Sequence, residues 1–445
     1  MLLPLLSHSD RTAVVAFRDD HALRVDAFLR DVAALAARLP ERSHLVNLCV
    51  DRYRFVVGFA AALVRRQVNL LPPGTASELL RELSRDYAGL YALTDSPVPD
   101  CPLETVDVEE ASGTQGVAAL PAFEPERLAA IAFTSGSTGK PAPHPKRWGA
   151  LVRGARAEAA AMELGDTPAA TVIGTVPAQH MYGLESTVML ALHNAYAWQA
   201  RRPFYPADIR RALEQAPPGR VLVTTPVHLR ALLEEEQRLP AVRLIICATA
   251  PLPVALAVEA EGRYGAPLLE VYGFTEAGQV ATRRTARSAE WCTMPGVRLR
   301  TDERGVWFGG GHVDAEALAS DVIEPLDDQR FVLHGRSADM VNIAGKRTSL
   351  AYLNHQLASI PGVEDGVYFL PDDTGDPVTR LVAFVVAPRL SAEAVLSALR
   401  ARVDAVFLPR PMHFVPALPR NATGKLPREA LVQLAQTCAA GKPGA

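Results

Sequence analysis

The chain of 445 residues is too long for one ordinary hydrophobic core, so we expect two or three domains. With 49% hydrophobic and 21% charged residues, its composition is that of a soluble globular protein and excludes a disordered chain. A formal net charge of −3 gives no electrostatic reason to expect nucleic acid or an anionic membrane as a partner.

The cysteines and the N-terminus indicate the compartment. The five cysteines are scattered without a C-x-x-C spacing, which argues against a zinc site or a disulfide framework. Residues 1–6 are apolar but lack the basic flank of a signal peptide. No uninterrupted apolar run reaches the roughly 20 residues that a membrane-spanning helix needs. We therefore expect a cytoplasmic protein with reduced thiols and no membrane partner.

Helical and strand patterns alternate from the N-terminus onward. Apolar spacing predicts a helix over 22–39, a buried strand over 45–50 and a helix over 53–68. A further amphipathic stretch over 76–90 follows a Pro-Pro-Gly turn. Residues 96–125 are rich in Pro, Gly and acidic side chains, which predicts a surface connection. This alternation predicts a parallel α/β sheet.

The second half of the chain shows different patterns of predicted strands and helices. Strand-like runs recur first, over 128–133, 171–176, 220–225, 244–248 and 267–271. Short strands with Gly turns from about residue 292 predict a smaller β-rich lobe. The expected fold class is therefore α/β, with a large N-terminal domain over 1–335 that holds parallel sheets and this lobe. A compact tail over 336–445, with helices over 350–359 and 391–405 and strands over 365–370 and 380–387, predicts a small α+β C-terminal domain.

The most distinctive local feature is a hydroxyl- and glycine-rich loop after a predicted strand. Its residues are Thr134, Ser135, Gly136, Ser137, Thr138, Gly139 and Lys140. Gly allows close backbone approach, and hydroxyls with main-chain N–H groups can surround phosphate oxygens. It is not a Walker P-loop, because with Lys140 as the motif lysine the first glycine would fall on Thr134. By composition alone it is more typical of a surface turn than of a phosphate loop.

A second motif, Tyr272-Gly273-Phe274-Thr275-Glu276, follows the predicted strand over 267–271. Open α/β sheets bind ligands at such strand ends. There an aromatic ring can lie against a purine, a hydroxyl can contact a phosphate and a carboxylate can hold Mg²⁺. The alternative is a helix start, with Thr275 as its N-cap and Glu276 in the first turn.

Two basic motifs lie further downstream. Residues 335–347 combine a strand with glycines and basic side chains around Arg336, and residues 419–428 carry Lys425 between Gly424 and Leu426. Either one, taken alone, is typical of a solvated basic turn.

The four motifs together, in this order over about 130–430, resemble the adenylate-forming superfamily of acyl- and aryl-CoA synthetases, peptide-synthetase adenylation domains and luciferases. The resemblance implies that the Ser/Thr/Gly loop binds the β- and γ-phosphates of ATP. It also implies that Thr249 and Ala250 pack against adenine, with Tyr272 and Gly273 on its other face.

The same resemblance implies roles for the remaining residues. Thr275 would contact the α-phosphate and Glu276 would bind Mg²⁺. Asp321 would bind the ribose hydroxyls with help from Arg336. His180 is similar to the gate beside the acyl pocket in the family. Lys425, on a mobile C-terminal domain, is similar to the lysine of the first half-reaction.

The chain departs from the family pattern in three places. Ala142 follows Pro141 where the family usually has lysine, so Lys140 and Lys146 are the candidates for its replacement. At the hinge, Ala338 stands where the family usually has Asp or Lys, and Asp339 is next to it. The segment between Trp291 and Asp321 is also short.

The resemblance implies two-step chemistry, in which a carboxylic acid becomes an acyl-adenylate and is then transferred to a thiol. The pocket is expected from residues 180–184, 224–229, 247–249 and 272–278, which are mostly small or apolar. Only Glu185 could pair with an amino acid's ammonium, so a compact aromatic acid is favoured. The chain looks most like stand-alone ligases of bacterial aryl-polyene and xanthomonadin pigment clusters, which implies a hydroxybenzoate or a hydroxycinnamate as the acid, with 4-hydroxybenzoate or a near relative as the specific prediction.

Three functions remain open from the sequence. The first is transfer to the phosphopantetheine of an acyl carrier protein, as in those pigment clusters. The second is transfer to CoA, for which Arg65, Arg66, Arg201 and Arg202 do not decide. The third is an inactive nucleotide-binding scaffold, against which the intact Glu276 argues.

Overall fold

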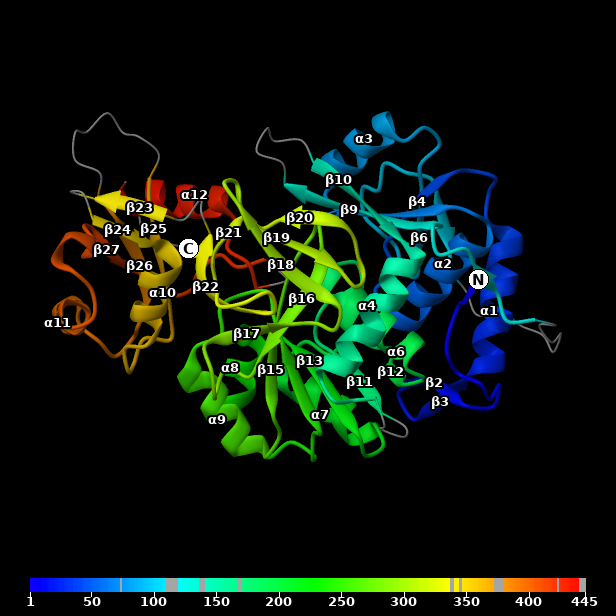
Figure 1. Ribbon diagram of the computed structural model, residues 1–445, viewed down its shortest axis with the longest axis horizontal. Coiled ribbons are helices and arrows are strands. Elements are labelled where there is room, and N and C mark those ends of the chain that lie inside the picture. Colours follow the sequence, from blue (N-terminus) through cyan, green and yellow to red (C-terminus); the bar gives the residue numbers. More distant parts are fainter. Residues whose placement is uncertain are drawn as a thin grey trace.

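The computed structural model describes residues 1–72, 74–108, 119–135, 141–165, 170–336, 340–343, 346–371, 380–421 and 424–439. The molecule is elongated, with the N-terminal helices at one end of its long axis and the C-terminal elements at the other (Figure 1). Within the described ranges, no helix has both the length and the apolar character needed to cross a membrane.

The N-terminal region is built on a six-stranded sheet. Its strands, in spatial order, are β10 (Pro141–Arg147), β9 (Leu128–Ser135), β5 (Val68–Leu71), β4 (His44–Asn47), β6 (Tyr91–Thr94) and β7 (Thr105–Asp107). All neighbours pair in parallel except β9 and β10, which are antiparallel. The connecting helices are α1 (Val25–Arg38), α2 (Arg52–Val64) and α3 (Ser77–Asp86). Helix α2 is apolar on nearly every side because it is enclosed by the surrounding elements.

An eleven-stranded sheet forms the centre of the molecule. Its order is β21 (Asp321–Pro325), β22 (Arg330–Arg336), β17 (Glu290–Thr293), β16 (Gly278–Arg283), β15 (Leu268–Phe274), β14 (Leu244–Cys247), β13 (Arg220–Thr224), β11 (Thr171–Gly174), β12 (Ala197–Gln199), β2 (Val14–Arg18) and β3 (His21–Arg24). The run from β2 to β15 is parallel, and antiparallel strands flank it on both sides. Parallel strands buried on both faces explain the continuous apolar runs of the sequence.

Helices connect these central strands. They are α4 (Trp148–Ala161), α5 (Met181–Gly183), the π-helix η1 (Leu184–Met189), α6 (Leu190–His193), α7 (Pro206–Gln215), α8 (Pro226–Glu234) and α9 (Val254–Tyr264). A small antiparallel sheet of β18 (Val297–Asp302), β19 (Gly305–Gly310) and β20 (Val313–Leu318) is the predicted β-rich lobe. The short strands β1 (Leu3–Pro4) and β8 (Ala122–Phe123) pair separately.

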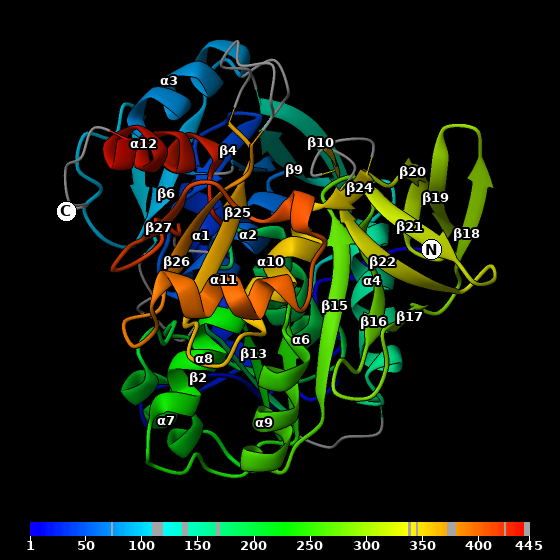
Figure 2. The same ribbon diagram turned by 90° about the vertical axis from the view of Figure 1, so that its left-hand side faces the viewer.

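The C-terminal elements form a unit with its own hydrophobic cores. They are β23 (Met340–Ile343), β24 (Lys346–Ser349), α10 (Leu350–Ala358), β25 (Asp365–Phe369), β26 (Val382–Val386), α11 (Ala392–Arg400), the 3₁₀ turn η3 (Ala405–Phe407), β27 (Met412–Phe414) and α12 (Arg428–Ala439). Two of the buried apolar clusters contain only residues from Val341 onward, and the others contain none of these. Seen along the long axis, this unit lies in front of the central sheet (Figure 2).

The fold class and most predicted elements are confirmed, with shifted boundaries. The helix predicted over 53–68 ends at Val64, because β5 begins at Val68. The predicted surface connection over 96–125 contains β7 and β8. The sheets are mixed rather than only parallel, because hairpins such as β15–β16 extend the parallel core.

Candidate active site

The predicted site segments meet where parallel strands end. Strands β11, β13 and β14 each lead into a loop at the same edge of the central sheet. The hydroxyl of Tyr182 lies 3.0 Å from the carbonyl oxygens of both Thr224 and Ile246. This side chain therefore fastens the segment after β11 to the ends of β13 and β14, which brings three of the predicted pocket segments together.

Tyr272 and Asp321, 49 residues apart, are in direct contact. The Tyr272 hydroxyl donates a hydrogen bond of 2.6 Å to Asp321 Oδ2. The Tyr272 ring packs at 5.7 Å from Trp291 and from Phe331, which fixes its orientation. Asp321 also faces Arg336 across the β21–β22 ladder, so the backbone places all three positions of the predicted adenosine site together.

The Tyr272 motif does not follow its strand, as the sequence predicted, but lies within it. Strand β15 continues to Phe274, because pairing with β16 adds residues to it. Glycine is required at 273, since a Cβ there would lie 2.5 Å from the Gly278 carbonyl oxygen. Thr275 and Glu276 form the turn of this hairpin, so the alternative of a helix start is wrong.

Strand β10 places two basic side chains beside Glu276. His144 Nε2 lies 3.8 Å from Glu276 Oε1, and Lys146 Nζ donates a 3.2 Å hydrogen bond to the Glu276 carbonyl oxygen. The Glu276 side chain is 44% exposed, so its carboxylate is accessible to a cation.

Lys146 and Glu185 are buried at one pocket and influence each other's charge, which the sequence did not reveal. Lys146 is only 7% exposed, and burial lowers its pKa against the opposing effect of nearby carboxylates, Glu185 foremost. Burial raises the pKa of Glu185 to about 7, although Lys146 and a backbone hydrogen bond from Gln279 oppose the shift. Glu185, the one acid considered for an amino-acid substrate, thus faces a lysine of the protein itself.

His180, on the large domain, lies within the electrostatic influence of Lys425 on the C-terminal unit. His180 is the N-cap of α5, where its Nδ1 accepts a 3.3 Å hydrogen bond from the Tyr182 N–H. Burial lowers the pKa of His180 to about 4, and the positive charge of Lys425 contributes. The imidazole is therefore neutral at pH 7.

The loop that carries Lys425 rests on the large domain. A Cβ on Gly424 would lie 3.5 Å from Val227 Cγ2 in α8, so the two segments are in contact. The Lys425 N–H donates a 2.9 Å bond to Asn421 Oδ1, and Arg420 pairs with Asp365 at 2.7 Å. These bonds shape the loop and join it to β25, which positions Lys425 at the edge of the central sheet.

The segment after β14 has an unusual backbone. Thr249 has a φ of +81°, in the left-handed region that a β-branched residue rarely adopts. Thr249 and Ala250 are half-buried at the same edge as Tyr272. A strained backbone held by its surroundings is typical of ligand-binding segments.

Some predicted residues lie outside the described part of the chain. Strand β9 leads to the phosphate loop, but residues 136–140 and the side chains of Thr134 and Ser135 are not described. The same holds for the hinge candidates Ala338 and Asp339 and for the side chain of Arg336. Which lysine replaces the missing one after Pro141 therefore stays open.

Family models agree with this architecture. The model of AMP-binding enzymes matches residues 8–301, and that of the AMP-binding enzyme C-terminal domain matches residues 354–425. The chain belongs to the AMP-binding enzymes, the adenylate-forming superfamily, and is an AMP-forming acid–thiol ligase that uses ATP.

Its relatives are ligases with CoA in their names. A 4-coumarate–CoA ligase of Rhodobacter capsulatus is 34% identical over 311 residues, which cover 69% of this chain and 77% of the relative. A second, of Halorhodospira halophila, is 32% identical and covers 66% and 73%. The solved O-succinylbenzoate coenzyme A synthetase of Bacillus subtilis with AMP shares the fold, with a TM-score of 0.79, 20% identity and coverage of 94% of both chains.

Proposed function

We propose that this chain activates a small aromatic carboxylic acid as its acyl-adenylate and transfers the acyl group to the thiol of CoA. The observation that carries the proposal is the contact of the Lys425 loop with α8, at the sheet edge where Tyr272 contacts Asp321. A nucleotide at Tyr272 and an acid beside His180 would there face a common lysine.

The first step forms a mixed anhydride. A carboxylate oxygen of the acid attacks the α-phosphorus of ATP, the bond to the bridging oxygen breaks, and pyrophosphate leaves. Both reactants are anionic, so repulsion and developing charge dominate the barrier. The ammonium of Lys425 would reduce the repulsion and stabilise the developing charge. The neutral His180 would form a wall of the acid pocket without adding charge.

The residues present fit a bound nucleotide and Mg²⁺. The accessible Glu276 carboxylate is a hard oxygen ligand on a turn whose backbone is held by Lys146. When bound there, Mg²⁺ would neutralise phosphate charge. Asp321 would hold the ribose hydroxyls with Arg336, Thr275 would contact the α-phosphate, and Thr249 with Ala250 would line the adenine site.

The pocket favours an aromatic acid. Its segments supply His180, Thr224 and His228 as polar groups among small or apolar residues, and the charge of Glu185 is already offset by the nearby Lys146. Named relatives act on 4-coumarate and on 3- and 4-hydroxybenzoate, which supports an acid of this size. Within this class we propose 4-hydroxybenzoate or a near relative, because the resemblance to pigment-cluster ligases implies a hydroxybenzoate or a hydroxycinnamate.

CoA is the better supported acceptor. The named relatives are CoA ligases, whereas no observation favours the carrier-protein transfer expected from the pigment-cluster resemblance. In the second step the CoA thiol attacks the acyl carbon, AMP leaves, and a thioester forms. We propose that the C-terminal domain rotates near Arg336 before this step, with Ala338 or Asp339 as the pivot.

A panel of acids tests the function. The full-length protein is incubated with ATP, Mg²⁺ and each acid, and pyrophosphate release is measured alone, with CoA and with an acyl carrier protein. We expect 4-hydroxybenzoate or a close relative to drive release, and CoA to yield the thioester. Pyrophosphate release driven only by amino acids or medium-chain fatty acids would contradict the proposal of an aromatic acid. Thioester formation only on the carrier protein would contradict the proposal that CoA is the acceptor.

A further inference from the structure

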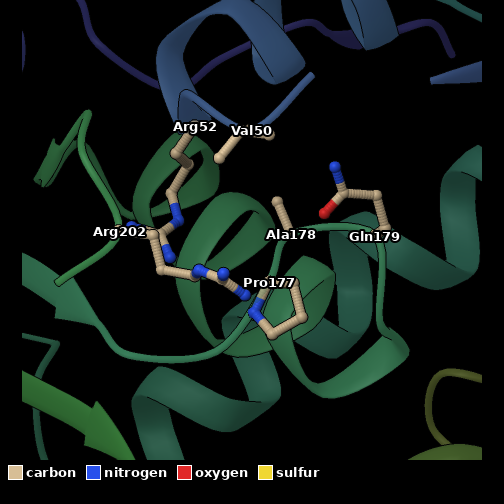
Figure 3. Close-up of a pocket in the computed structure, with 6 residues that line it drawn as sticks. All are labelled: Val50, Arg52, Pro177, Ala178, Gln179 and Arg202. Carbon is tan, nitrogen blue, oxygen red and sulfur yellow. The ribbon is translucent and has the colours of Figure 1, made fainter. Parts of the chain in front are cut away.

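A cavity of about 70 Å³ lies beside the candidate active site, and two arginines line it. Its walls come from Val50, Arg52, Pro177, Ala178, Gln179 and Arg202. Arg52 enters from the first turn of α2, Arg202 from the segment after β12, and residues 177–179 form another side (Figure 3). Residues 177–179 directly precede His180, so the cavity shares a loop with the acyl pocket.

Arg52 is a buried cation without a carboxylate partner. The residue is 1% exposed, and its guanidinium donates to the carbonyl oxygens of Gln199 and Gly174 at 3.0 Å and of Val176 at 2.8 Å. Its Nε is buried and has no hydrogen-bond partner. Neutral carbonyls orient the guanidinium but do not cancel its charge, which burial makes costly.

Arg202 adds a second positive charge to the same cavity. Burial lowers the pKa of Arg52 to about 10, and Arg202 contributes to this shift. The charge of Asp51 opposes this shift, but Asp51 is itself paired with Arg18 at 3.1 Å. Across the described ranges, neither Arg52 nor Arg202 forms an ion pair with a carboxylate. Two guanidinium groups at one cavity without a directly paired carboxylate repel each other, and an anion bound between them would relieve this repulsion.

We propose that this cavity is a phosphate-binding subsite for the thiol acceptor, formed by Arg52 and Arg202. The proposal rests on the proposed function, because it names the part of the acceptor that is held. Guanidinium groups match phosphate oxygens in geometry and charge. A phosphate held on the loop that carries His180 leaves the other end of the acceptor, its thiol, on the side of the acyl pocket.

Two acceptors, CoA and a carrier protein, carry such a phosphate. Pantetheine, which has no phosphate, tests whether the phosphate is recognised, and 4′-phosphopantetheine tests the arm without the CoA nucleotide. The phosphopantetheine arm has one phosphate, in CoA as in a carrier protein, and CoA has further phosphates on its nucleotide. ATP phosphates are expected elsewhere, at the loop after β9 in the other sheet. The KM for ATP therefore serves as an internal control.

The experiment compares Arg202→Gln with the parent and with Arg201→Gln. Arg201 is adjacent in sequence but exposed, and its pair with Asp19 at 2.9 Å lies on the surface. Thioester formation from 4-hydroxybenzoate is measured with CoA, 4′-phosphopantetheine and pantetheine. We expect Arg202→Gln to raise the KM for both phosphorylated thiols by about 10-fold to 100-fold, the range for losing a charge-assisted hydrogen bond. The KM values for pantetheine, ATP and the acid should not change, and Arg202→Lys should recover part of the loss.

The outcomes separate this subsite from the proposed function. An effect on CoA alone assigns the subsite to its nucleotide phosphates, and an effect on both thiols assigns it to the arm; both support the proposal. Three outcomes overturn the proposal. The KM for pantetheine rises as much as that for CoA, or only the KM for the acid changes, or Arg202→Gln and Arg201→Gln give the same KM values. Calorimetric titration of CoA and pantetheine onto the full-length parent and Arg202→Gln gives the same comparison without turnover, even if no acid in the panel reacts.

Discussion

At the scale of single residues, the site depends on charges whose partners come from distant segments. Burial, with a contribution from Lys425 on the other unit, lowers the pKa of His180, and Lys146 opposes the rise that burial causes in the pKa of Glu185. The sequence pattern predicted Lys425, because it lies in a motif of its family. Lys146 had no such motif, and its burial beside Glu276 follows only from the pairing of β10 with β9.

Replacing Lys425 with Ala should separate the two half-reactions. We expect adenylation to fall by about 10²–10³-fold, because a preorganised charge at the α-phosphate is lost. Thiolysis of added acyl-adenylate should change much less. Pyrophosphate release and thioester formation measure the two steps. Arg400→Ala, an exposed cation on α11, is the matched control. Parent-like adenylation in Lys425→Ala would refute the assigned role.

At the scale of elements, the β15–β16 hairpin carries the nucleotide motif. A single register shift between Tyr272 and Gly273 directs the tyrosine toward Asp321 and the turn toward β10. Local pattern correctly predicted the strand that enters this hairpin. It did not predict where the strand ends, because that end depends on pairing with β16.

Gly273→Ala should destabilise the hairpin and weaken adenylation. The new Cβ would lie 2.5 Å from a backbone oxygen that cannot move independently of β16. We expect a loss of about 1–3 kcal/mol in the free energy of unfolding, as for other overpacked sites. Gly262→Ala in α9 is the control, because nothing lies within 4 Å of its Cβ, and it should stabilise the helix by about 0.5–1 kcal/mol. Urea denaturation measures the change in the free energy of unfolding for each variant. Equal stabilities of the two variants would contradict the packing argument.

At the scale of the whole molecule, buried titratable groups should shape the pH dependence of stability. Burial lowers the pKa of His8, His180 and His228 to about 4 and of His193 to about 3. Between these values and 6.5 the unfolded chain binds more protons, so stability rises with pH. Burial raises the pKa of Glu158 to about 8 and of Glu185 to about 7. Between pH 4.5 and these values the native state binds more protons than the unfolded chain, so this contribution to stability falls as the pH rises.

Burial also lowers the pKa of His44 and His312 and raises that of Glu270, so the histidines still outnumber the acids below pH 6.5, and the acids dominate above it. We therefore expect the free energy of unfolding to be greatest near pH 6.5 and to fall on either side. Denaturant titrations between pH 4.5 and 8 measure this curve. Glu158→Gln should flatten the alkaline side, and His193→Leu should flatten the acid side. A curve unchanged in both variants would show that other groups dominate.

The sequence by itself determined the fold class, most of the elements, and the family with its adenylation chemistry. These follow from apolar periodicity and from short motifs, which are local properties of the chain. The tertiary structure alone decided which of these residues meet. Tyr272 contacts Asp321, the Lys425 loop contacts α8, and Arg52 lies with Arg202 at one cavity, because sheet order brings strand ends together across long sequence separations. The two arginines carried no sequence motif, since their significance lies in a shared burial that no local pattern records.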